Sequence, residues 1–208
     1  MVRCMCVVLA ISLVLPTAMS AGPAATIRGD PQVIAEVQAA QTKFNSAKSW
    51  RSSRTMSIAA QSALMPPMTT EFVAPDRTRM TWADGRGGTA GQVRIGSDFW
   101  SFGSGACMKS APGIRPPGPD AREAVQGPAD ATIEVAKGGR ETVEGMVTQV
   151  YTRAYAMSEG QVRQKLFVVV DSGYFRRIET AVARDGVTLS ITMDYVDYDS
   201  PITINPPC

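Results

Sequence analysis

The side chains that most often perform catalysis are scarce in this chain, because its 208 residues include no histidine. Histidine is the usual general base and the commonest metal ligand near neutral pH. A Ser-His-Asp or Cys-His site is therefore excluded, and no lysine lies in a recognisable serine-lysine motif. We predict no catalytic residue and no cofactor, and the composition favours a carrier or binding protein over an enzyme.

Two other kinds of chemistry depend on pairs of side chains. Asp194 and Asp197 are close enough in the sequence to form a carboxylate pair, although such residues more often lie on a solvated strand face or in a turn. Sulfur-containing side chains occur at three places that could bind a soft metal such as Cu(I): Met65 with Met68, Cys107 with Met108, and Met146. Their spacing is not that of a recognised site, so no metal is predicted.

The first twenty residues have the parts of a secretory signal peptide. Arg3 supplies positive charge, residues 7–15 form an apolar run, and Ala18-Met19-Ser20 offers small residues for cleavage. We expect cleavage near Ser20 and a periplasmic protein of residues 21–208, a length typical of one domain. No later apolar run reaches the roughly 18 residues that a membrane-spanning helix requires.

Charge is nearly balanced, with 21 lysines and arginines against 19 aspartates and glutamates. The arginines are spread along the chain, and we interpret them as solvated residues at strand edges. A nucleic-acid partner would need a concentrated basic stripe, so none is predicted.

Cys107 and Cys208 are the cysteines that remain after cleavage. Two cysteines in an oxidising compartment favour a disulfide, which here would tie the C-terminus to a mid-chain loop. Two free thiols, or a bridge to another molecule, are the alternatives.

One long amphipathic helix is predicted at residues 31–46. Asp30 is a suitable N-cap, and Pro31 fits the first helical position because its missing N–H costs nothing there. Apolar residues follow at helical spacing: Val33, Val37, Ala40 and Phe44. The helix therefore has one face to bury.

Beyond the helix the apolar residues alternate with a period of two, which is typical of strands. The predicted strands lie at 51–59, 71–73, 77–82, 93–95, 99–102, 131–136, 141–155, 164–170, 174–182 and 187–195. Tight-turn sequences at 171–173 and 184–186 indicate antiparallel neighbours. Residues 103–130 interrupt the pattern with ten glycines and prolines and are interpreted as a long lid loop with a short helix.

These elements predict an α+β fold. Its sheet is a strongly curved antiparallel half-barrel of about nine to eleven strands, because a sheet of that size must curl or close. The long helix and the 103–130 loop would cover the concave face, yet they are too small to cover it completely. An apolar ligand is a candidate for the remaining space.

Three segments resemble the periplasmic lipoprotein-carrier superfamily of LolA and LolB and the lipid-binding lipoproteins of the LppX type. They are residues 44–50, residues 72–80 with 93–102, and residues 195–207. The resemblance implies a half-open sheet closed by helices around an apolar cavity. It also implies a monomeric carrier for the acyl chains of a lipoprotein or lipid, with a membrane-bound donor or acceptor protein. The alternative is a sensor of the same fold that binds an envelope protein through the outer face of its sheet.

The resemblance and the strand alternation together suggest ligand contacts. Arg79 matches the arginine that latches the lid in LolA, with a surface or rim position as the alternative. Thioethers and flat rings suit acyl chains because they repack around a flexible ligand. The predicted ligand-binding residues are Met56, Ile58, Arg79, Met80, Trp82, Trp100, Phe102, Ile191 and Met193.

Overall fold

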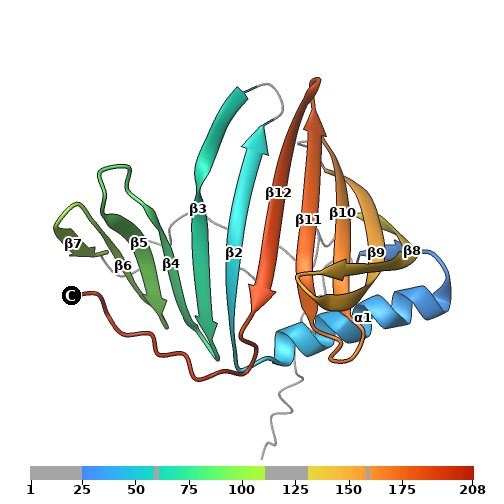
Figure 1. Ribbon diagram of the computed structural model, residues 1–208, viewed down its shortest axis with the longest axis horizontal. Helices are drawn as coiled ribbons and strands as arrows, with labels where there is room; N and C mark the ends of the chain where they lie inside the picture. Colours follow the sequence, from blue (N-terminus) through green and yellow to red (C-terminus); the bar gives the residue numbers. More distant parts are fainter. Residues whose placement is uncertain (1–24, 59–60, 111–130, 158–159) are drawn as a thin grey trace, which may run out of the picture.

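The computed structural model describes residues 25–58, 61–110, 131–157 and 160–208, which form one curved, twelve-stranded sheet and helix α1 (Pro31–Ser46). The strands follow the order β1 (Thr26–Arg28), β8 (Thr132–Val143), β9 (Met146–Met157), β10 (Gly160–Val169), β11 (Phe175–Arg184), β12 (Val187–Val196), β2 (Ser49–Ile58), β3 (Gln61–Val73), β4 (Arg77–Ala83), β5 (Thr89–Ile95), β6 (Asp98–Gly103) and β7 (Ala106–Lys109) (Figure 1). Only the β1–β8 pair is parallel among these neighbours. The predicted α+β half-barrel is confirmed, with one strand more than expected.

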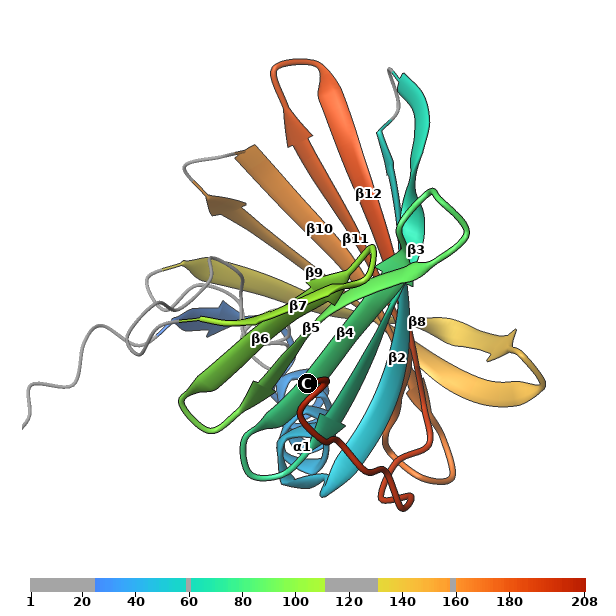
Figure 2. The ribbon, with the colours of Figure 1, turned by 90° about the vertical axis from the view of Figure 1, so that its left-hand side faces the viewer.

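Two antiparallel meanders make up the sheet, β2–β7 and β8–β12, and the pairing of β12 with β2 joins them. This pair sets Ile191 opposite Met56 and Tyr195 opposite Ser52, so segments more than a hundred residues apart lie side by side. Seen from the side, the strands fan out as the sheet twists from β7 to β10 (Figure 2). The hairpin turns predicted at 171–173 and 184–186 are confirmed.

Helix α1 begins and ends where the sequence predicts. The Asp30 Oδ1 atom accepts hydrogen bonds from the N–H groups of Gln32 at 2.8 Å and Val33 at 3.3 Å, and so satisfies two free helix donors. The helix lies across one end of strands β9–β12 (Figure 1). It covers only that end of the sheet.

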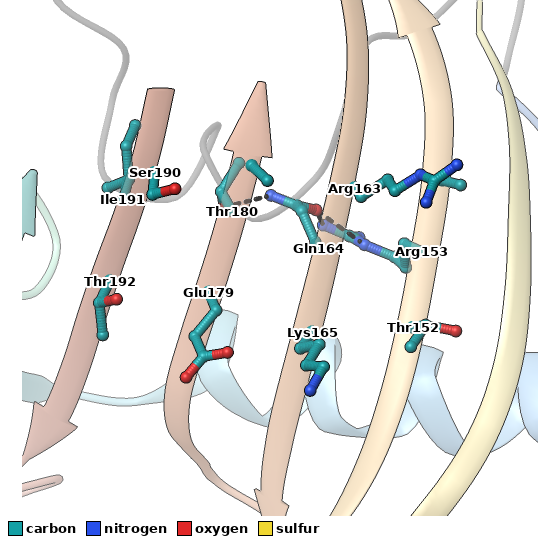
Figure 3. Close-up of a pocket in the computed structure, with 12 residues that line it drawn as sticks. Thr152, Arg153, Arg163, Gln164, Lys165, Glu179, Thr180, Ser190, Ile191 and Thr192 are labelled. Atoms are coloured by element: carbon teal, nitrogen blue, oxygen red, sulfur yellow. Dashed lines mark hydrogen bonds between the residues drawn. The ribbon is translucent and has the colours of Figure 1, made fainter. Parts of the chain in front are cut away.

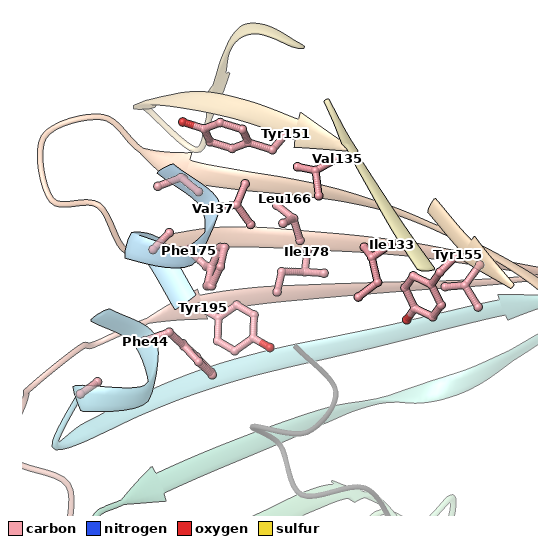
Figure 4. Packing of buried hydrophobic residues seen from close by; sticks show 14 of the residues in the cluster. Val37, Phe44, Ile133, Val135, Tyr151, Tyr155, Leu166, Phe175, Ile178 and Tyr195 are labelled. Atoms are coloured by element: carbon pink, nitrogen blue, oxygen red, sulfur yellow. The ribbon is translucent and has the colours of Figure 1, made fainter. Parts of the chain in front are cut away.

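An aromatic cluster holds α1 against the sheet. Phe44, with none of its surface exposed, lies 5.5 Å from the ring of Trp50, 5.8 Å from Phe175 and 5.3 Å from Tyr195. Leu166 and Ile178 extend this core along the strands (Figure 4). Burying aromatic residues of this size supplies much of the apolar stabilisation of a small domain.

The two sides of the sheet can be told apart because directly paired residues share a face. We call the side packed against α1 the helix face. The opposite side, the tail face, is covered near β5–β7 by residues 197–208. There Ile204 is buried against Val93 and Trp100, and Arg77 Nη1 donates to the Ile204 carbonyl at 3.2 Å.

The predicted disulfide is present. Cys107 on β7 and Cys208 are bonded, with their Cα atoms 6.2 Å apart, so the tail is tied covalently to the tail face. The proposed lid segment differs from the prediction at its start, because residues 106–109 form β7 rather than loop. Its remainder, 111–130, and the expected signal peptide lie outside the described residues.

Candidate functional site

Six of the predicted ligand-binding residues share the helix face. The pairings Ile191–Met56 and Trp82–Met68 place neighbouring strands in register there. All six are partly exposed rather than fully packed: Met56, Ile58, Met80, Trp82, Ile191 and Met193.

The structure adds Met68, Val182 and Leu189 to this set, since they pair with its members and are also half-buried. We call these nine residues the apolar stripe. The stripe crosses β11, β12, β2, β3 and β4, mostly toward the strand ends remote from α1 (Figure 1). Among the described residues, Val182 and Met193 of the stripe pack against the core cluster that includes α1, and the other seven stripe residues lie outside that cluster. The helix therefore leaves most of the stripe open.

Trp100 and Phe102 do not belong to the stripe, and the prediction that they face the same way as Met80 is wrong. Trp100 pairs with Val93 on the tail face, where it is 6 % exposed. The ring of Phe102 lies over Gly91, whose missing Cβ leaves space for it. Both rings instead pack beneath the C-terminal segment, in a second small core that the proline-rich tail sequence did not suggest.

Arg79 also lies on the tail face, away from the apolar stripe. It forms an ion pair with Glu71, which is 8 % exposed and also accepts from Arg51 at 3.0 Å. Arg51 in turn pairs with Asp197 at the start of the tail. In this structure Arg79 is part of an ion-pair network that links β4, β3, β2 and the tail.

A polar row on the helix face was missed by the sequence analysis. Arg153 donates from Nε to Gln164 Oε1 at 3.1 Å, and Gln164 Nε2 donates to Thr180 Oγ1 at 3.1 Å (Figure 3). The strand register continues this row directly into Ile191 and Met56 of the apolar stripe. Arginines had been interpreted as solvated, yet Arg153 is only 6 % exposed.

The tail face carries a separate pocket of about 550 Å³ over β9–β12 (Figure 3). Two cross-strand rows flank it, one with Lys165 beside Glu179 and the other with Arg163 beside Ala181. The rest of its lining consists of Thr152, Ala154, Ser190 and Thr192, together with four residues of the polar row and its continuation described above: Arg153, Gln164, Thr180 and Ile191. Most of the lining side chains, such as Lys165 and Glu179, lie on the tail face, on the opposite side of the sheet from the apolar stripe.

The carboxylates considered for catalysis are each held by an arginine. Asp194 accepts from Arg177 Nε at 2.7 Å, and Asp197 pairs with Arg51. Among the described residues, no three cysteine or acidic side chains are grouped so that they could hold a metal. The described part of the chain also contains no helix long and apolar enough to cross a membrane.

Neither a protein-family profile nor a curated sequence matches this chain. Solved structures do. Lipoprotein LppX from Mycobacterium tuberculosis is 13 % identical, with a TM-score of 0.62 over 85 % of this chain and 100 % of that one. LprF from Mycobacterium bovis is 12 % identical, with a TM-score of 0.57 over 86 % and 98 % of the two chains. The chain therefore has the fold of LppX and LprF, and the LppX-like fold is the one that its sequence segments suggested.

Proposed function

We propose that this protein is a periplasmic carrier that binds the acyl chains of a lipoprotein or lipid and moves them between membranes. The observation that supports the proposal is the apolar stripe. Its methionines, leucine and isoleucines are half-buried on the face that α1 only partly covers, whereas residues of the true core, such as Trp50, have no exposed surface.

Reversible burial would supply the affinity. Each methylene removed from water contributes about 0.8 kcal/mol, so a few acyl carbons along the stripe already give useful binding. Methionine suits this role because its unbranched thioether adapts to chains of different shape. Release would then require a membrane or an acceptor protein that offers the acyl chain an equally apolar place.

An apolar dye tests the location. N-phenyl-1-naphthylamine, which fluoresces in apolar surroundings, should bind and be displaced by methyl palmitate. The double variant Met56→Gln/Ile191→Gln should weaken binding about tenfold or more, because a polar amide replaces apolar surface at two paired positions.

The matched control uses the next residues on the same two strands. Ser57 and Ser190 pair with each other on the tail face, so Ser57→Gln/Ser190→Gln should leave dye binding unchanged. Equal loss of binding in both double variants would refute the stripe as the acyl site. No displacement by methyl palmitate in the wild type would refute the carrier function.

A further inference from the structure

We infer that Arg153 is the binding site for a single negative charge on the acyl ligand, so that the protein prefers an anionic lipid over its neutral counterpart. This inference rests on the proposed carrier function and adds a ligand class to it. The polar row defined by Arg153, Gln164 and Thr180 would hold the anionic group, and the adjoining stripe would hold the chain.

Among the described residues, Arg153 is buried without a counter-charge. Only 6 % of its surface is exposed, and within the described ranges it makes no ion pair. Its Nε and Nη2 atoms both donate to the one oxygen Oε1 of Gln164, which leaves Nη1 without an acceptor among those residues. A buried cation of this kind is costly for folding, and burial lowers the pKa of the Arg153 guanidinium.

Arg176, the other buried arginine, shows what a structural role looks like. It is 3 % exposed, but it pairs with Glu144 and donates from Nη1 to the Tyr195 carbonyl at 3.0 Å. Within the described ranges, Arg153 has neither a carboxylate nor a backbone carbonyl as its partner, and its one acceptor is the side-chain amide oxygen of Gln164. The fold therefore compensates one buried charge and leaves the other free for an external anion.

The surroundings favour an anion attached to an apolar chain. Tyr155 lies next to Arg153 on the same face, close enough for the guanidinium to oppose the rise that burial causes in the pKa of its hydroxyl. Val162, directly opposite Tyr155, supplies an apolar wall. A guanidinium and a phenol in apolar surroundings can both donate to one carboxylate or phosphodiester.

The register of the strands indicates the direction in which the acyl chain of the ligand would lie. The row runs from Arg153 on β9 through Gln164 and Thr180 to Ile191 and Met56 on β2. Four strand spacings of about 4.8 Å separate its ends, or about 19 Å. An extended acyl chain anchored at Arg153 would thus cross the sheet and end on the apolar stripe.

The test compares palmitate, its neutral methyl ester, a palmitoyl lysophosphatidylglycerol and inorganic phosphate on the folded wild type. Palmitate and the lysolipid should each bind at least about tenfold more tightly than methyl palmitate, as expected for charge-assisted hydrogen bonds. Inorganic phosphate should not compete at millimolar concentration, because it lacks the chain. Equal affinity for palmitate and methyl palmitate would overturn the inference while leaving the carrier function intact; no binding of either lipid would refute both.

Variants then test which arginine binds the negative charge of the ligand. Arg153→Met should abolish the preference for palmitate, leave methyl palmitate binding unchanged, and keep or raise the melting temperature of the ligand-free protein. Arg163→Met, an exposed arginine on the neighbouring strand and opposite face, is the matched control and should change nothing.

Two outcomes would contradict the assignment. If Arg153 had a purely structural role, its replacement would lower the melting temperature and weaken the binding of both lipids equally. Loss of the preference in Arg54→Met rather than in Arg153→Met would place the charge site at Arg54, which lies half-buried within the stripe region beside Met68.

Discussion

The period-two alternation of the strands determines on which face of the sheet each charged residue lies. Arg153 lies between Tyr151 and Tyr155, two positions away from each, and all three side chains are buried on the helix face. That pattern was legible in the sequence as an arginine within an aromatic run. The sequence analysis interpreted all arginines alike, as solvated residues. Whether an arginine has a counter-charge depends on which residues lie opposite it on neighbouring strands, and the sequence alone does not show that register.

Asp199 is a charged residue whose role at the start of the tail is structural. Its Oδ1 accepts from the Lys48 N–H at 2.7 Å and its Oδ2 accepts from the Tyr174 hydroxyl at 2.7 Å. These hydrogen bonds hold the pKa of Asp199 below its usual value, and the bond from Tyr174 has the largest effect. A lowered folded-state pKa means that the stabilisation is complete above the ordinary carboxyl pKa of about 4 and is lost as the pH falls through the folded value.

Asp199→Ala should therefore lower the free energy of unfolding by about 1–2 kcal/mol at pH 7, a value reduced for the exposure of the carboxylate. The difference from wild type should shrink as the pH falls below about 4 and leave only the pH-independent cost of alanine at a positive φ of 56°, measured by urea unfolding across the pH range. Asp171→Ala, an exposed aspartate on the β10–β11 turn, should have no comparable effect. A deficit of the same size at pH 7 and pH 3 would contradict the explanation.

At the scale of elements, local signals predicted α1 well and β3 poorly. The Asp30 cap, Pro31 and the spacing of Phe44 all favour one helix, and the structure confirms it. β3 was expected only at 71–73 but runs from Gln61 to Val73, through Pro66 and Pro67. Prolines lack the N–H of a ladder, so local rules argue against a strand there. The pairing of β2 with β3 is a long-range effect that such rules do not contain.

The C-terminal tail is the other element whose packing was not foreseen. Its prolines suggested an extended edge, which is correct locally, but Ile204 also covers Trp100 and Val93. This second core explains why Trp100 and Phe102 point away from the stripe. Alternation alone places residues on two faces, and only tertiary packing shows that the tail covers one face of β5 and β6.

Cys208→Ser should lower the free energy of unfolding by about 2–4 kcal/mol, because a loop spanning 101 residues is no longer closed in the unfolded chain. Wild-type protein under reducing conditions should show the same loss, and tryptophan fluorescence should report exposure of Trp100. Since the bond lies on the tail face, binding of N-phenyl-1-naphthylamine should stay within about twofold of wild type while the chain is folded. Unchanged stability in both cases would show that the bond does not anchor the tail.

For the whole molecule, the order of elements was enough to predict a curved half-barrel with one long helix and the LppX-like fold. The site could be predicted only in part. Alternation placed Met56, Met80 and Ile191 on one face, and the structure has them together on the helix face, whereas Arg79 was assigned by analogy and lies on the other side of the sheet. The row that begins at Arg153 depends on the register of five strands, which no local pattern specifies.

Native mass spectrometry of the protein purified from a bacterial periplasm shows directly whether the protein carries an acyl chain. We predict a species heavier than the mature polypeptide by the mass of one lipid or acyl group, which is lost in Met56→Gln/Ile191→Gln and retained in Ser57→Gln/Ser190→Gln. A bound polypeptide in place of a lipid would favour the envelope-sensor alternative. The mass of the empty polypeptide alone, under several gentle ionisation conditions, would contradict the account.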